Sequence, residues 1–166
     1  GVPTLGVVLQ PVSGALCWAS LGNGAFQELD GIRARLQVSH AGDVTSARIG
    51  ISRTNQPPNL RRLLDTRAWW SNARPMGAST KLMALARGDL DAVINLSNAE
   101  MPWDTCAPWV ILREAGGTYT GADTNALFDA DDELVFMAQD AGDRAPANAC
   151  FPAGTLTNSP VELAIT

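Results

Sequence analysis

Two stretches of the chain place groups that can do phosphate chemistry at the expected starts of helices. In one of them, Asp104 lies at the start of an apolar run that ends in Gly116 and Gly117. An aspartate at this position is typical of a helix start, and paired glycines are typical of a helix end. The carboxylate either caps its own helix or reaches outward to a cation, and this stretch by itself favours the cap.

The other stretch lies upstream, where Gly77–Lys81 precede a run that closes at Arg87 and Gly88. The first backbone N–H groups of a helix have no partner within it, so they can hold an anion such as phosphate. Asp91–Ile94 then predict a short buried strand. A carboxylate suited to a cation and a helix start suited to an anion together predict a site for phosphate chemistry.

The elements that must position these groups alternate between strand and helix. The expected strands are 4–10, 15–20, 25–27, 47–52, 92–95, 117–120 and 134–138, and the expected helices are 57–67, 79–87 and 105–115. The first two strands are joined by a hairpin turn. Antiparallel strands followed by alternation predict a layered α/β fold.

The organisation along the chain changes twice. Residues 1–46 are expected to form an antiparallel strand and hairpin part, and residues 47–138 an α/β sandwich. Residues 139–166 are rich in Ala, Pro, Asn, Thr and Gly and are expected to form an irregular tail, in which Val161–Ile165 is a possible short strand.

Composition and charge exclude some partners. The chain has 166 residues, of which 46% are hydrophobic and 17% charged, and its net charge is −5. An acidic chain disfavours nucleic acid as the main partner, and no apolar run reaches the roughly 18 residues that span a bilayer, so neither nucleic acid nor membrane is expected. The low charge indicates that a partner covers part of the surface.

The cysteines and the single histidine indicate no catalytic or zinc site. Cys17, Cys106 and Cys150 are odd in number and form no Cys-x-x-Cys pair, so we expect reduced thiols in a cytoplasmic protein. His40 lies among loop residues and is expected to be solvated. Trp69 and Trp70 have basic neighbours and can stack on bases, but core or interface packing is favoured.

Taken in order, these motifs resemble the inositol monophosphatase superfamily of metal-dependent phosphomonoesterases. The resemblance covers about residues 3–134. The residues that carry it are Gly6–Val12, Gly22–Phe26, Gly77–Lys81, Gly88–Ala92, Trp103–Ala107 and Arg113–Gly117. In addition, Ile51–Thr54 resemble the strand end of the branch that cleaves 3'(2'),5'-bisphosphate nucleotides.

Two acidic motifs of that superfamily are absent from these residues: Glu-Glu or Glu-Asp, and Asp-Pro-x-Asp-Gly-Thr. The resemblance therefore implies an αβαβα sandwich of which this chain supplies the C-terminal half to two-thirds. It also implies a partner, either the missing N-terminal part of the enzyme or another chain, and a possible homodimer.

The resemblance implies a catalytic site built around Asp104 and Mg2+. Asp104 would be one of several carboxylate ligands to two or more Mg2+ ions that activate a water and stabilise the leaving alkoxide. The residues implied to hold the substrate are Gly77, Ala78, Ser79, Lys81 and Arg53. Lys81 would meet a second phosphate, or else be a solvated helix lysine. The chain alone is expected to be inactive, because one ligand cannot hold Mg2+ firmly.

The function implied is a Mg2+-dependent phosphatase that removes the 3'(2')-phosphate of adenosine 3',5'-bisphosphate-type nucleotides. The alternatives are an inositol or sugar monophosphatase of the same superfamily, and a non-catalytic fragment that binds a partner chain. The segment Asn95–Glu100 argues mildly against inositol, since inositol phosphatases place a glutamate there to hold substrate hydroxyls. Ala78 stands where many relatives have Ser or Thr. Pro108 replaces a common Gly, and we expect it in the first helical turn.

Overall fold

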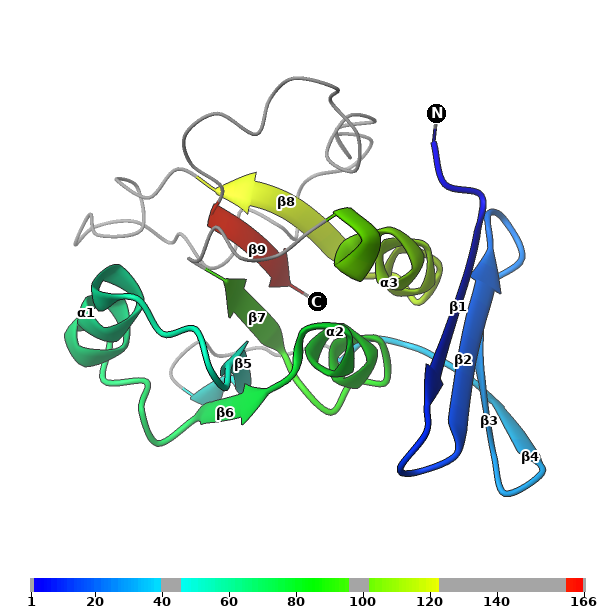
Figure 1. Ribbon diagram of the computed structural model, residues 1–166, viewed down its shortest axis with the longest axis horizontal. Helices are drawn as coiled ribbons and strands as arrows, with labels where there is room; N and C mark the ends of the chain where they lie inside the picture. Colours follow the sequence, from blue (N-terminus) through cyan, green and yellow to red (C-terminus); the bar gives the residue numbers. More distant parts are fainter. Residues whose placement is uncertain (1, 40–45, 96–101, 123–160, 166) are drawn as a thin grey trace.

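The computed structural model describes residues 2–39, 46–95, 102–122 and 161–165, which form two sheets and three helices in layers (Figure 1). The strands are β1 (Leu5–Gln10), β2 (Ala15–Ser20), β3 (Ala25–Leu29), β4 (Ile32–Arg35), β5 (Ile49–Ser52), β6 (Ala73–Met76), β7 (Ala92–Asn95), β8 (Thr118–Ala122) and β9 (Val161–Ile165). The helices are α1 (Pro58–Thr66), α2 (Ala78–Ala86) and α3 (Pro102–Glu114). None of these helices is long and apolar enough to cross a lipid bilayer.

The first sheet is an antiparallel meander in the order β1-β2-β3-β4. Its inner face is lined by small side chains with almost no exposed surface, namely Ala15, Cys17, Ala19 and Ala25. Small residues allow α3 to come close, and at Gly6 a Cβ would overlap the carbonyl oxygen of Ala107. Glu114 ties the same helix to the β2–β3 turn, because its carboxylate accepts the backbone N–H groups of Gly22 at 2.9 Å and Gly24 at 2.8 Å.

Helices α2 and α3 pack against each other in the layer between the two sheets (Figure 1). One hydrophobic core runs from the first sheet through these helices, and it includes Cys17, Leu85 and Ile111. On the far side of the second sheet, α1 buries Leu60, Leu63 and Leu64. The order of layers is therefore sheet, helices, sheet, helix.

The second sheet has the order β6-β5-β7-β9-β8. β5 pairs in parallel with both β6 and β7, and β9 pairs antiparallel with both β7 and β8. β7 is buried along its whole length, as expected for a parallel strand with helices on both faces. Because β5, β6 and β7 run in the same direction, their carboxyl ends meet at one edge, beside the start of α2.

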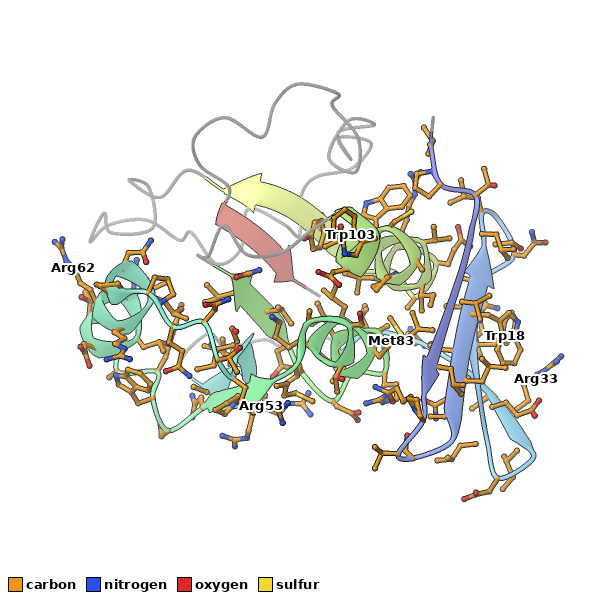
Figure 2. The ribbon with its side chains drawn as sticks, viewed as in Figure 1. Trp18, Arg33, Arg53, Arg62, Met83 and Trp103 are labelled. Carbon is orange, nitrogen blue, oxygen red and sulfur yellow. The ribbon has the colours of Figure 1, made fainter. Side chains whose placement is uncertain are left out.

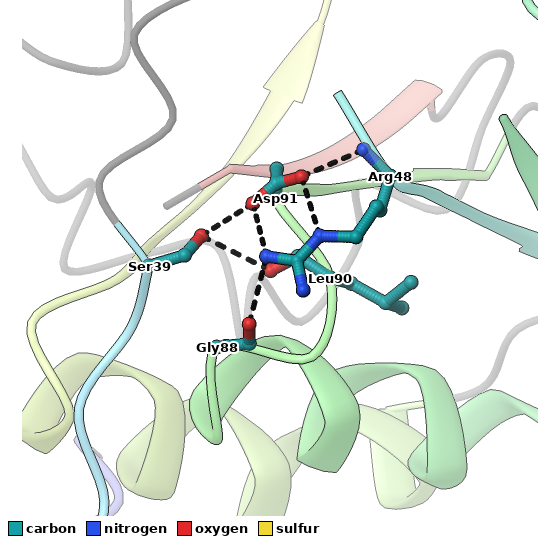
Figure 3. A network of polar contacts seen from close by, with 5 residues as sticks. All are labelled: Ser39, Arg48, Gly88, Leu90 and Asp91. Carbon is teal, nitrogen blue, oxygen red and sulfur yellow. Dashed lines mark hydrogen bonds and ion pairs between the residues drawn. The ribbon is translucent and has the colours of Figure 1, made fainter. Parts of the chain in front are cut away.

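An ion pair fixes the opposite end of β7 (Figure 3). Asp91, just before the strand, accepts from the Arg48 guanidinium at 2.6 and 2.9 Å, from the Arg48 backbone N–H at 2.7 Å and from the Ser39 hydroxyl at 2.6 Å. Arg48 also donates to the carbonyl of Gly88 at 2.8 Å. The Arg48 hydrogen bonds are the main reason why the pKa of Asp91 is lowered from 3.8 to about 2.

The structure confirms the expected strands and helices within the described residues, with bounds shifted by a few residues at most ends. Two strands, β4 and β6, were not predicted. Both lie at sheet edges, where charged residues and proline are compatible with a strand. Their sequences therefore lack the alternation of apolar and polar residues that predicts a strand, because exposed residues occupy them: Arg33 and Arg35 on β4, and Arg74 and Pro75 on β6. The strand expected at 134–138 lies outside the described residues.

The possible short strand within the tail is present. Residues 161–165 form β9, which lies inside the second sheet, between β7 and β8. Their sequence, Val-Glu-Leu-Ala-Ile, alternates as a strand does. The position of this strand in the sheet depends on its pairing with β7, which is distant in sequence.

Candidate functional site

A pocket of about 140 Å3 opens at the carboxyl ends of the three parallel strands. Ser52, Met76 and Asn95, which line it, are the last residues of β5, β6 and β7. Ligands of open α/β sheets bind at this edge, because the loops and helix starts that follow the strands converge there. The pocket brings together five residues that the sequence pointed to: Arg53, Gly77, Ala78, Lys81 and Asp104.

Asp104 lies in the first turn of α3, which begins at Pro102. The helix was expected to begin at Thr105, so the carboxylate is not at the cap position but within the helix. Asp104 lines the same pocket as Gly77 and Lys81, so it is not remote from the predicted anion-binding residues.

The start of α2 presents its backbone N–H groups at the pocket. Gly77 precedes the helix and has no side chain with which to cap it. The first hydrogen bond of the helix runs from the Lys81 N–H to the Gly77 carbonyl at 3.0 Å. The N–H groups of 78–80 therefore precede the hydrogen bonds within the helix. Gly77 and Ala78 line the pocket, which gives an anion access to this turn.

Ser79 connects the two helix starts instead of lining the pocket. Its hydroxyl donates to the backbone carbonyl of Asp104, with an Oγ–O distance of 3.4 Å. Pro108 explains why this carbonyl is open to a side chain. Pro108 lies inside α3 and not, as expected, in its first turn. A proline has no N–H, so the Asp104 carbonyl four residues earlier lacks its helical donor, and Ser79 supplies one.

Two cationic side chains line the pocket beside the anion-binding turn. Lys81 is only 2% exposed, so the alternative of a solvated helix lysine is wrong. Arg53 is exposed and follows the end of β5, close to β6 (Figure 2). Positive charge at both positions strengthens attraction for a phosphate, most of all where the site excludes water.

The sequence analysis named none of four further lining residues as a site residue, although two of them fall in the Ile51–Thr54 motif: Ser52, Thr54, Asn55 and Met76. Asn55 is held in place because its backbone N–H donates to the Ser52 hydroxyl at 2.9 Å. The only signal for these residues is their place after or at the end of a parallel strand. Asn95, considered as a substitute for a glutamate, is 5% exposed in the lining, whereas Glu100 lies outside the described residues.

The described residues supply one carboxylate that suits a divalent cation. Asp104 is an oxygen ligand of the kind that Mg2+ prefers, so the residue fits a magnesium site. Within 2–39, 46–95, 102–122 and 161–165, no three His, Cys, Asp or Glu side chains come together as a metal-binding group. Further ligands would have to come from other residues.

The remaining residues singled out in the sequence lie outside the pocket. Burial raises the pKa of the Cys17 thiol, which contacts the Gln27 amide oxygen at 3.6 Å, and Cys106 is a free thiol on α3. Trp69 is buried and Trp70 donates its indole N–H to Asp65 at 2.6 Å. His40 and Cys150 lie outside the described residues.

Comparisons with known proteins agree with this geometry. The sequence pattern of the inositol monophosphatase family matches residues 1–149. Histidinol-phosphatase of Mycobacterium tuberculosis is 35% identical over 130 residues, which are 74% of this chain and 48% of that protein. Mouse 3'(2'),5'-bisphosphate nucleotidase 1 is 43% identical over 51 residues, which are 31% of this chain and 17% of that protein.

A solved structure shows the same fold. CysQ from Bacteroides thetaiotaomicron, a bacterial member of the inositol monophosphatase family, superposes with a TM-score of 0.59 and 26% identity. The match covers 73% of this chain and 50% of that one. The chain thus spans about half the length of the histidinol-phosphatase and of CysQ. With a family pattern that covers most of its residues, the chain belongs to the inositol monophosphatase family.

Proposed function

We propose that the protein to which these residues belong is a Mg2+-dependent phosphomonoester hydrolase, and that the pocket at the ends of β5, β6 and β7 is its active site. The observation that carries the proposal is the meeting of Asp104 with the Gly77–Ala78 turn and Lys81 in one pocket. A cation ligand and an anion-binding turn are the two requirements of metal-assisted phosphate-ester hydrolysis.

Each residue has a distinct part in this proposal. The backbone N–H groups of the first turn of α2, next to Gly77, hold phosphate oxygens and are strengthened by the helix dipole. Lys81 and Arg53 balance the negative charge of the bound phosphate. Asp104 helps to hold Mg2+, which when bound supplies an activated water and stabilises the leaving oxygen. Asn95 and Asn55 offer amide groups to substrate hydroxyls.

We propose a 3'(2'),5'-bisphosphate nucleotide as the substrate. The resemblance of Ile51–Thr54 to the strand end of the branch that cleaves these nucleotides supports this choice. The similarity to mouse bisphosphate nucleotidase supports the same choice. A second candidate is histidinol phosphate, or an inositol or sugar monophosphate, because the longer alignment is with a histidinol-phosphatase.

The remaining magnesium ligands are proposed to come from residues outside this sequence, either the rest of a longer enzyme or another chain. The outer face of the first sheet supports such a neighbour. Leu5, Val7 and Leu9 of β1 point away from α3 and are 63%, 53% and 58% exposed. A row of exposed apolar side chains marks a contact surface. The cytoplasmic location remains a proposal from the cysteine pattern.

A phosphate-release assay tests the proposal. The 166-residue chain and a longer protein that also carries the two acidic motifs are each incubated with adenosine 3',5'-bisphosphate, inositol 1-phosphate and histidinol phosphate, with and without Mg2+. We expect the longer protein to release phosphate only with Mg2+ and fastest from the bisphosphate, and the chain alone to be inactive. Turnover of all substrates without Mg2+ would contradict the mechanism. Faster release from a monophosphate would contradict the proposed substrate.

A further inference from the structure

Ser79 connects the two groups on which the proposed reaction depends. The residue was expected to bind substrate, but it does not line the pocket, and its hydroxyl donates to the Asp104 carbonyl with an Oγ–O distance of 3.4 Å. Ser79 also belongs to the first turn of α2, whose backbone N–H groups are proposed to hold phosphate. One side chain therefore joins the proposed anion-binding turn to the backbone of the proposed metal ligand.

Pro108 acts on the backbone of Asp104 in particular. The proline is fully buried and lies inside α3. A proline in a helix interior removes the hydrogen bond to the carbonyl four residues earlier, and its ring pushes that carbonyl aside. Four residues before Pro108 is Asp104, so the peptide group that the proline displaces belongs to the proposed metal ligand. Ser79 offers this carbonyl a hydroxyl in place of the helical N–H.

Neighbouring elements hold the start of α3 on two sides. On the side of the first sheet, Gly6 of β1 lies so close to the Ala107 carbonyl that a Cβ at Gly6 would overlap it. On the other side, α2 packs along α3 (Figure 1), and Ser79 contacts the Asp104 carbonyl about one turn before Ala107. Thr105, next to Asp104, is only 5% exposed. The place of the Asp104 carboxylate in the pocket therefore depends on what contacts the backbone beside it.

We propose that Ser79 is a positioning residue, which together with Pro108 sets the place of the Asp104 carboxylate relative to the anion-binding turn of α2. This inference rests on the proposed function, because it takes Asp104 as a magnesium ligand. A metal site loses affinity when a ligand has to be reoriented before it binds, since that ordering costs part of the binding free energy. Ser79 thus acts on the cation through Asp104, and its side chain does not touch the phosphate.

Two probes of the 15N-labelled 166-residue chain, followed by NMR, separate positioning from substrate binding without any need for turnover. One is Mn2+, a paramagnetic ion that suits the same oxygen ligands as Mg2+ and broadens amide signals close to it. The other is inorganic phosphate. We expect Mn2+ to broaden the signals of 103–106, and Asp104→Asn to abolish this broadening. Ser79→Ala should raise the Mn2+ concentration that is needed about fivefold, equivalent to about 1 kcal/mol, and should change phosphate affinity by less than about twofold.

Rescue variants and a matched control separate the contact from a general effect on stability. Ser79→Thr keeps the hydroxyl, and Pro108→Ala returns a backbone N–H to α3, so S79T and S79A/P108A should both respond to Mn2+ within about twofold of the wild type. Thr66→Ala is the control, because the Thr66 hydroxyl also donates to a backbone carbonyl, that of Arg62 at 2.8 Å, but lies on α1 outside the pocket. It should leave the Mn2+ response unchanged. A double variant as weak as Ser79→Ala would overturn the part assigned to Pro108.

The outcomes distinguish this role from the proposed active site itself. An unchanged Mn2+ response in Ser79→Ala would overturn the positioning role alone, and so would equal weakening by Thr66→Ala. Weaker phosphate binding with an unchanged Mn2+ response would make Ser79 a substrate contact instead. If 103–106 showed no broadening that depends on Asp104, the proposed active site would be contradicted as well. If Ser79→Ala gives an unfolded spectrum, Ser79→Cys, whose thiol is a weaker donor, serves in the same test.

Discussion

At the scale of single residues, Asp104 and the start of α2 meet because two helices converge at one edge of a sheet. Neither Asp104 nor Gly77 is unusual at the start of its own helix, since aspartates and glycines are common there. Their meeting in one pocket with Lys81 gives them a chemical meaning. The contact between Ser79 and the Asp104 carbonyl shows that the two helix starts are also joined directly.

The first prediction concerns Asp104 in a protein that contains the complete set of metal ligands. Asp104→Asn keeps the size of the side chain but removes its charge, so it should lower kcat at least about a hundredfold, as expected for a lost electrostatic partner of the reaction. The measurement is steady-state phosphate release at several Mg2+ concentrations. Unchanged kcat and unchanged Mg2+ dependence would remove Asp104 from the site.

The second prediction concerns the pair Ser79 and Pro108. Ser79→Ala should destabilise the chain by about 1 kcal/mol, because it removes the hydroxyl that donates to the Asp104 carbonyl. Pro108→Ala restores a backbone N–H that can reach this carbonyl, so Ser79→Ala should cost less in that background. Urea unfolding of the wild type, both single variants and the double variant measures this coupling. Additive effects would show that the serine does not compensate for the proline.

At the scale of elements, the two ends of β7 have different parts in the second sheet. One end carries Asn95 into the pocket, and the other is fixed by the ion pair between Asp91 and Arg48. This network joins the segment after β4, the residue before β5 and the loop between α2 and β7 (Figure 3). Because this loop follows α2 directly, the network also holds the chain at the C-terminal end of that helix.

The third prediction is a pH dependence of stability. The pKa of Asp91 is about 2 in the folded chain and near 3.8 when unfolded, so the ionised group favours folding above pH 4. This contribution, on the order of 1–2 kcal/mol because Arg48 is partly exposed, should be lost as the pH falls from about 4 to about 2. The measurement is urea unfolding of wild type and Asp91→Asn across this range. The difference between them should shrink toward low pH, and a constant difference would contradict the assignment.

At the scale of the whole molecule, the described residues form four layers, in the order sheet, helices, sheet, helix. The inner face of the first sheet is closed by α3, whereas β1 leaves Leu5, Val7 and Leu9 more than half exposed on the outer face. The Arg33 Cζ atom lies 4.9 Å from the centroid of the Trp18 ring on the neighbouring strand, so a cation–π contact covers part of this face.

The fourth prediction follows from the exposed side of β1. Burial of these three side chains would be favourable by several kcal/mol, so the isolated chain should self-associate at micromolar concentration. Replacing Leu5, Val7 and Leu9 by threonine keeps strand propensity and should restore a monomer. Sedimentation velocity measures the change.

A matched control uses exposed apolar residues elsewhere. Threonine at Val2 and Val12, which are exposed but outside β1, should leave the association unchanged. A wild-type chain that stays monomeric up to about 100 μM would contradict the idea that this face is a contact surface. If both sets of substitutions reduced self-association equally, the association would be a nonspecific effect of exposed apolar residues and would not depend on β1.

The sequence by itself determined the local elements and most of the candidate site. The apolar spacing of Leu60, Leu63 and Leu64 indicates a helix at α1. Pro57 and Pro58 at its start and the glycine after α2 mark helix ends through local sterics and hydrogen bonding. The family motifs marked Asp104, Gly77, Ala78, Lys81 and Arg53, which the structure brings to one pocket.

Tertiary structure decided what depends on neighbours distant in sequence. The insertion of β9 between β7 and β8, the edge strands β4 and β6, and the burial of Lys81 all depend on what packs beside them. The same holds for Asp91, which the sequence placed at the start of a buried strand without indicating its ion pair with Arg48. Local sequence fixes backbone preference within a few residues, whereas pairing, burial and charge environment come from contacts that form only when the whole chain is assembled.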